Sequence, residues 1–183
     1  MFKDCPVTIY QLEEEFFPLL EEYKNLKNKK VVLEIGETEG GTLWYWIQNA
    51  PPKTHIIVID SNISQKKTDL WQDWADKKNV QLVIYDENST DKQLIKDIHT
   101  YYPQIDFLFI DGSHIYKTVK SDFMNYSTLV RKGGIIALHD INNDNRPEYE
   151  VDKLWKEIKE TGYNTKELIT IRDKVGGMGI VYP

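Results

Sequence analysis

Five short apolar runs, separated by longer amphipathic segments, constrain the fold of this chain more than any other feature. The first run reads Val-Val-Leu-Glu-Ile at 31–35, and the fourth, at 105–110, is apolar apart from Asp106. Runs of this length, rich in β-branched residues, are typical of strands buried on both faces of a parallel sheet. The five expected strands span 31–35, 56–59, 80–85, 105–110 and 135–138.

Segments with apolar residues at helical spacing lie between and after these runs. The expected helices span 43–49, 64–78, 91–101, 116–130 and 151–161. Strands that alternate with helices predict a doubly wound, Rossmann-like α/β fold with helices on both faces of the sheet. Two further strands are expected at 168–171 and 179–182, and their short connection favours an antiparallel pair. The prediction is a seven-stranded, mostly parallel sheet with an antiparallel last strand.

A further amphipathic helix is expected at 8–24, ahead of the first strand. Thr8 is its expected N-cap, and Pro18 predicts a kink or two short helices. We expect one domain over 1–183, with 1–30 as an N-terminal helical extension and 31–183 as the ligand-binding core.

Charge and cysteine content exclude several classes of partner. The net charge is −6 over 183 residues, which disfavours nucleic acids as ligands. No apolar run approaches a membrane span, and the N-terminus lacks the apolar core of a signal peptide. Cys5 is the only cysteine and has no partner for an internal disulfide. A cytoplasmic protein that does not bind membranes is expected, and a homodimer remains open.

Polar residues follow each of the five expected strands. In parallel α/β sheets, ligands bind outside the carboxyl ends of the strands. Five such positions on one edge therefore predict a site there. The residues are Gly36 with Gly40 and Gly41, then Asp60, then Asp86 and Asn88, then Asp111 to His114, and finally His139 with Asp140.

The loop 34–42, which runs from Glu34 to Thr42, is the expected centre of this site. Its glycines allow a tight turn and close approach of a ligand, and the helix that follows offers free N–H groups. An ordinary strand-to-helix turn would need glycine as well. The G-x-x-x-G-G spacing differs from the dinucleotide pattern G-x-G-x-x-G. Glu37 and Glu39 would repel a pyrophosphate but not a sulfonium, which favours S-adenosylmethionine as the ligand.

The ends of the second and third strands complete the expected cofactor site. Asp60 can accept hydrogen bonds from both ribose hydroxyls. Asp86 and Asn88 could bind an adenine, although an ordinary turn explains them about equally well.

Two stretches resemble a known family. Val32 to Gly36, continued by Gly40 to Thr42, resembles motif I of class I methyltransferases. The stretch Phe109 to Tyr116, with Asp-Gly-Ser-His-Ile-Tyr at its end, resembles methyltransferase family 24, as do the segments up to His139-Asp140. That family in turn resembles the cephalosporin hydroxylase and macrolide sugar O-methyltransferase group. The resemblance covers 31–141 and implies S-adenosylmethionine bound by Glu34, Gly36, Gly40, Gly41, Thr42, Asp60, Asp86, Asn88 and Asp111.

The resemblance also implies O-methylation of a small polar or sugar-like acceptor. Related enzymes hold a divalent cation with acids after the fourth and fifth strands, where this chain has Asp111, His139 and Asp140. A histidine among the ligands suits manganese, iron or zinc better than magnesium. His114 and His139 are the candidate bases, with Asp111 to orient His114 or take the substrate hydroxyl, although a lone histidine is more often structural. Trp44, Tyr45, Tyr116 and 142–146 could shape the acceptor pocket.

Two other functions remain open from the sequence. One is a non-catalytic binding module with the same fold. The other is an NAD(P)-dependent oxidoreductase, because Tyr116 and Lys120 stand four residues apart on an expected helix. The glycine spacing argues against the second.

Overall fold

The computed structural model describes residues 2, 4–143, 146–170 and 175–183. One seven-stranded sheet has the order β3-β2-β1-β4-β5-β7-β6. The strands β1 to β5 run parallel, and β7 is antiparallel to both β5 and β6. This confirms the prediction of a mostly parallel sheet closed by an antiparallel strand. The strands are β1 (Val31–Ile35), β2 (His55–Asp60), β3 (Gln81–Asp86), β4 (Ile105–Ile110), β5 (Val130–Asn142), β6 (Asn164–Leu168) and β7 (Gly176–Tyr182).

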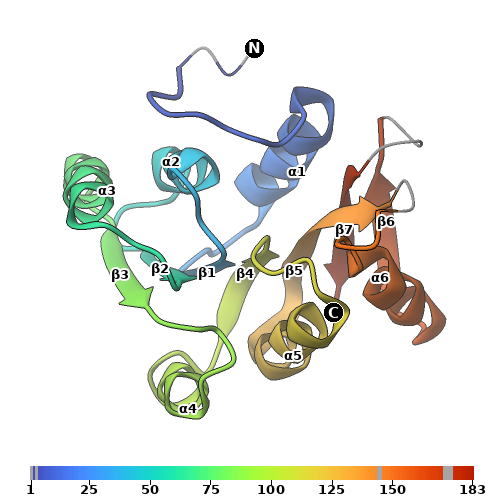
Figure 1. Ribbon diagram of the computed structural model, residues 1–183. Coiled ribbons are helices and arrows are strands. Elements are labelled where there is room, and N and C mark those ends of the chain that lie inside the picture. Colours follow the sequence, from blue (N-terminus) through green and yellow to red (C-terminus); the bar gives the residue numbers. More distant parts are fainter. Residues whose placement is uncertain (1, 3, 144–145, 171–174) are drawn as a thin grey trace.

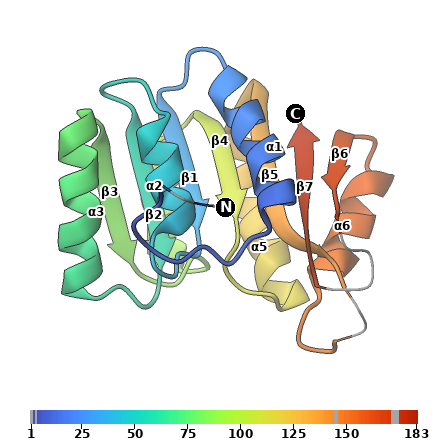
Figure 2. The same ribbon diagram turned by 90° about the horizontal axis from the view of Figure 1, so that it is seen from above.

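Helices cover both faces of the sheet (Figures 1 and 2), with α1, α2 and α3 packed on one face and α4, α5 and α6 on the other. Alternate residues of each strand point to opposite faces, so the sheet separates two apolar clusters. On β1, for example, Val32 packs in the cluster beneath α1, α2 and α3, and Leu33 packs in the cluster beneath α4, α5 and α6. The helices are α1 (Glu13–Asn25), α2 (Gly41–Gln48), α3 (Gln65–Lys78), α4 (Lys92–Tyr101), α5 (Tyr116–Tyr126) and α6 (Val151–Glu160).

The start of α1 differs from the sequence prediction. The helix begins at Glu13 with Leu12 at the N-cap, so Thr8 is not the cap, and 8–12 precede the helix. Pro18 lies within one helix rather than between two. A proline removes only one backbone hydrogen bond, and burial of Phe16, Leu19, Leu20 and Tyr23 on the same helix offsets that loss.

Several boundaries near the C-terminus also differ. The helix expected at 116–130 ends at Tyr126 and continues as a 3₁₀ turn over Ser127–Leu129. The fifth strand begins at Val130 rather than 135, because Val130 pairs with Ile105 before the register shifts. It ends at Asn142 rather than 138, because pairing with β7 continues past 138, so His139 and Asp140 lie within the strand and not after it. The last strand begins at Gly176 rather than 179. The strand expected at 168–171 instead spans 164–168, and its predicted end lies outside the described residues. Its sequence, Asn-Thr-Lys-Glu-Leu, lacks an apolar run because β6 is an edge strand with one partner.

Among the described residues, the structure has no helix that combines the length and the apolar character needed to cross a membrane.

Candidate active site

A cavity of about 500 Å³ opens at the carboxyl edge of the sheet. It lies at the point where β1 has β2 on one side and β4 on the other, which is the switch point of the strand order. Its walls come from separate parts of the chain: the loop after β1, the loop after β4, the end of β5, the segment between β5 and α6, the start of β7, and Thr8–Leu12 with Glu15. Residues far apart in sequence therefore share one concave site.

Gly36 holds the loops after β1 and β4 in contact. Its φ is +88°, and its N–H donates to the Ile59 carbonyl across 2.9 Å. A Cβ at this position would lie 2.3 Å from the Gly112 Cα and 2.4 Å from the Asp111 carbonyl oxygen. Both the left-handed backbone and this close approach require glycine.

Gly40 and Gly41 form the start of α2. Gly40 is left-handed, with φ +96°, and a Cβ there would collide with the Trp71 indole. A Cβ on Gly41 would lie 2.4 Å from Ile9 Cγ1. The N-terminal segment therefore packs directly on the glycine loop.

Glu34 and Thr42 lie beneath this loop. Glu34 is fully buried, and its Oε1 accepts hydrogen bonds from Thr42 Oγ1 at 2.6 Å and Trp46 Nε1 at 3.2 Å. Thr42 reaches the cavity lining, as does Glu37, whereas Glu34 lies behind them.

Asp60, Asp86 and Asn88 lie outside the lining of this cavity. Asp60 is nevertheless tied to the glycine loop, because its Oδ2 accepts the Glu37 N–H at 2.8 Å. Asp86 Oδ1 accepts the Ile63 N–H, and Asn88 Oδ1 accepts the Thr90 N–H. Each of these side chains thus accepts a hydrogen bond from the backbone of a loop.

Four polar side chains from the ends of β4 and β5 gather on the opposite wall. Asp111 Oδ1 lies 3.0 Å from His139 Nδ1, and Asp140 Oδ2 lies 3.0 Å from His114 Nε2. His139 Nδ1 is also 3.5 Å from Asp140 Oδ1. Asp140 has a φ of +58°, an uncommon conformation that is concentrated at functional sites.

The carboxylates shift the titration of both histidines. Burial alone would disfavour the imidazolium of His139, but the nearby Asp111 carboxylate outweighs it and raises the pKa to about 9. The hydrogen bond to Asp140 raises the pKa of His114.

The ligand atoms of Asp111, His139 and Asp140 all lie within 4.8 Å of one another. Two carboxylates and one imidazole at this spacing fit a divalent cation. In such a site the imidazole would favour manganese, iron or zinc over magnesium.

The sequence analysis missed the N-terminal wall of the cavity. Gln11 Nε2 donates to Asp111 Oδ2 at 2.5 Å, across 100 positions of sequence. The side chain of Glu15 is buried, lines the cavity and accepts the backbone N–H groups of Thr170 and Gly177. The apolar spacing assigned 8–12 to a helix and gave no signal that this segment covers the site.

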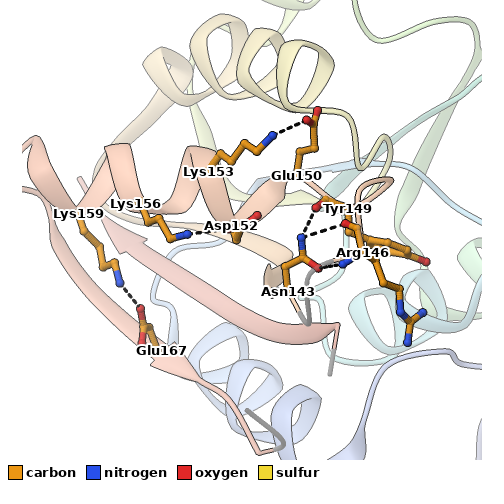
Figure 3. A network of polar contacts seen from close by, with 9 residues as sticks. All are labelled: Asn143, Arg146, Tyr149, Glu150, Asp152, Lys153, Lys156, Lys159 and Glu167. Carbon is orange, nitrogen blue, oxygen red and sulfur yellow. Dashed lines mark hydrogen bonds and ion pairs between the residues drawn. The ribbon is translucent and has the colours of Figure 1, made fainter. Parts of the chain in front are cut away.

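Part of the segment between β5 and α6 also reaches the cavity, and Figure 3 shows its residues Asn143, Arg146 and Tyr149 in polar contact. The Asn143 side chain donates to the carbonyls of Arg146 and Tyr149, and its Oδ1 accepts the Arg146 N–H at 3.0 Å. Arg146 and Tyr149 both line the cavity, and the Tyr149 ring stacks on His114 at 4.4 Å. Of the positions expected to shape the acceptor pocket, Arg146 lies in the lining, and 144–145 lie outside the described residues.

Trp44, Tyr45 and Tyr116 do not line the cavity. The Tyr116 hydroxyl donates to Glu157 and accepts from Lys120 at 2.7 Å, in a network that joins α5 to α6. The tyrosine–lysine pair is therefore part of a helix–helix contact and not of the cavity.

Comparison with known proteins identifies the family of this chain. The methyltransferase domain model Methyltransf_24 matches residues 33–141, more than half of the chain. Uncharacterized protein R132 of Acanthamoeba polyphaga mimivirus is 34% identical over 134 residues, which cover 68% of this chain and 58% of that protein. The match thus spans less than two thirds of that relative.

Solved methyltransferases share the fold. An O-methyltransferase from Bacillus cereus, in complex with S-adenosylhomocysteine (SAH), has a TM-score of 0.68 at 16% identity, covering 99% of this chain and 86% of the other. The MycE methyltransferase of the mycinamycin biosynthetic pathway, in complex with Mg and SAH, has a TM-score of 0.63 at 18% identity, covering 91% and 49%. At these identities the likeness concerns the fold. With the matching family model, it is clear that this chain belongs to the methyltransferase domain family Methyltransf_24.

Proposed function

We propose that this protein transfers a methyl group from S-adenosylmethionine to a hydroxyl of a small polar or sugar-like acceptor. One observation carries the proposal: the glycine loop after β1 lines the same cavity as the histidine–aspartate cluster from the loop after β4 and the last residues of β5. A methyl donor and a hydroxyl must meet in line within a few ångströms, and this arrangement supplies a site for each.

The glycine loop is the proposed donor site. The first turn of α2 has no side-chain cap, so its N–H groups can receive a carboxylate. Asp60 is held against this loop and is the proposed partner of the ribose hydroxyls. The SAH in the Bacillus cereus structure supports this choice of ligand.

The opposite wall is the proposed acceptor site. His114 lies at the cavity rim with 36% of its side chain exposed, its Nε2 held by Asp140 and its ring stacked on Tyr149. Its position suits a group that takes the proton of the acceptor hydroxyl. His139, at 11% exposure, is better placed to hold a ligand than to exchange protons with solvent.

Asp111, His139 and Asp140 are the proposed cation ligands. A bound divalent cation would polarise the acceptor hydroxyl and favour its ionised form. The magnesium in the MycE complex supports the presence of such an ion in related enzymes.

Calorimetric titration with SAH, with and without Mn²⁺, tests the donor assignment. We expect saturable binding, and no binding at millimolar SAH would refute the function. Methyl transfer is then measured with radiolabelled donor and a panel of free and nucleotide-linked sugars. His114→Ala should lose turnover, whereas His99→Ala should retain it, because His99 bonds the Asn125 carbonyl and does not line the cavity.

A further inference from the structure

Arg146 is the only arginine or lysine among the described residues that line the cavity. Its guanidinium stays charged at any physiological pH. The Asn143 side chain fixes the backbone of this arginine, because Asn143 Oδ1 accepts the Arg146 N–H at 3.0 Å and Asn143 Nδ2 donates to the Arg146 carbonyl at 3.1 Å. The same carbonyl accepts the Tyr149 N–H at 3.2 Å. The segment between β5 and α6 thus holds this positive side chain at the cavity.

The carboxyl groups of the lining are more buried than this arginine. Glu15, Glu37 and Asp140 are 1%, 7% and 6% exposed. The Asp111 side chain is 13% exposed, whereas Arg146 belongs to the exposed residues. The lining therefore separates carboxyl groups in its buried part from a cation in its exposed part. An acceptor that carries an anionic group is best oriented with that group toward Arg146.

A tyrosine ring connects Arg146 to the proposed base. The Tyr149 ring stacks on the His114 imidazole, with the ring centres 4.4 Å apart and the planes inclined by 21°. The guanidinium carbon of Arg146 lies 5.9 Å from the centre of the Tyr149 ring, and Figure 3 shows the arginine side chain beside that ring. Together these two separations place the guanidinium no farther than about 10 Å from the imidazole centre. One small molecule can therefore contact both side chains.

The chemistry of the arginine side chain indicates what it binds. A guanidinium presents a planar fork of N–H donors that matches the oxygens of a carboxylate or a phosphate. Hydrogen bonds between two charged groups are also stronger than those to a neutral hydroxyl. An arginine at this place therefore favours an anionic molecule over a neutral sugar.

We propose that Arg146 is a specificity-determining residue that binds an anionic group of the acceptor, a carboxylate or a phosphate. The acceptor is then a sugar-sized hydroxy acid or a sugar phosphate. It turns its anionic group toward Arg146 and the hydroxyl to be methylated toward His114. This inference rests on the proposed function and narrows its acceptor class.

Binding of D-glucuronate, D-glucose 6-phosphate and D-glucose to the protein saturated with SAH tests the proposal. Titration followed by NMR measures dissociation constants in the millimolar range. We expect at least one of the two anions to bind about 10-fold or more tightly than glucose, and the difference between the two anions distinguishes carboxylate from phosphate. Arg146→Gln should weaken binding of the preferred anion by about 10- to 100-fold and leave glucose binding unchanged.

Lys153→Gln is the matched control, because it removes the same charge from the neighbouring helix α6. Lys153 pairs with Glu150 and does not line the cavity (Figure 3). Anion binding by this variant should equal that of the wild type. The SAH affinity of Arg146→Gln should also equal that of the wild type, which verifies that the variant is folded.

Equal binding of anions and glucose by the wild type, or no binding of either anion, would overturn the proposal. So would an anion affinity that persists in Arg146→Gln, as expected if a bound cation holds the anion. An equal loss in Lys153→Gln would assign the effect to the overall charge instead of this site. A loss of SAH affinity in Arg146→Gln would place the arginine at the donor and contradict its role toward the acceptor. Failure of SAH to bind the wild type would refute the proposed function itself, whereas the other results refute only the role of Arg146.

Discussion

Substituting Gly36 by alanine gives the most direct test of how the site is assembled. The residue has φ +88°, and its added Cβ would lie 2.3 Å from the Gly112 Cα and 2.4 Å from the Asp111 carbonyl oxygen. The left-handed backbone alone costs a residue with a Cβ about 1–2 kcal/mol. Both obstacles are backbone atoms, so the two loops must separate, at a further cost of about 1–3 kcal/mol.

Gly162→Ala separates these two costs. Gly162 has φ +86°, almost the same as Gly36, but a Cβ there would meet nothing within 4 Å. Alanine restricts the unfolded chain more than glycine does, which stabilises the folded protein. This effect is similar for both substitutions and cancels in the comparison. We therefore expect Gly36→Ala to lower the free energy of unfolding by about 1–3 kcal/mol more than Gly162→Ala does.

Urea denaturation followed by fluorescence measures both values, provided that the slope with denaturant stays the same. SAH binding should weaken in Gly36→Ala and stay unchanged in Gly162→Ala, because only the former moves the cavity walls. If the two variants lose equal stability, the contact between the loops after β1 and β4 does not require glycine at position 36, and the steric argument is wrong.

Three other substitutions test separate features. Burial raises the pKa of the Asp122 carboxyl group from 3.8 to about 6, although the nearby Ser89 opposes part of this shift. The folded state therefore favours the protonated acid, and stability falls as the pH rises from about 3.8 to about 6. Asp122→Asn should raise the free energy of unfolding by up to about 3 kcal/mol at pH 8 and change it little at pH 4. A gain in stability that is the same at both pH values would contradict this explanation. Gln11→Leu removes the hydrogen bond from Gln11 to Asp111, which holds the segment Thr8–Leu12 against the cavity. Chymotrypsin should therefore cleave the variant faster at exposed Tyr10. An unchanged cleavage rate would show that this hydrogen bond does not hold the segment. Lys29→Met removes three hydrogen bonds to carbonyls at the end of α1 and should cost about 1–3 kcal/mol in thermal or urea unfolding, whereas a loss below the error of the measurement would make that contact dispensable.

The sheet could be predicted from sequence because each central strand is a short apolar run with a sharp end. The runs at 31–35 and 105–110 match β1 and β4 at both ends. Their limits are set locally, by Gly36 and Asp111 on one side and by polar residues on the other. The edge strand β6 has no such pattern, since it is half exposed and its limits depend on pairing with β7.

The location of the site could be predicted for the same reason, but its contacts could not. Topology alone brings Gly36, Asp111 and His139 to one edge. Which groups bond there depends on side-chain positions set by packing between distant segments. Two examples are the contact between Gln11 and Asp111 and the pairing of His114 with Asp140. No local sequence pattern predicts either contact.

The N-terminal segment also has a consequence for how the protein is handled in the laboratory. Residues Thr8–Leu12 precede the sheet by some twenty positions, yet they close one side of the cavity. A shortened chain that begins at Glu13 would keep α1, the sheet and every residue matched by the family model, yet it would lack this wall of the cavity. Acceptor screens on such a chain would report a broader preference than the intact protein has.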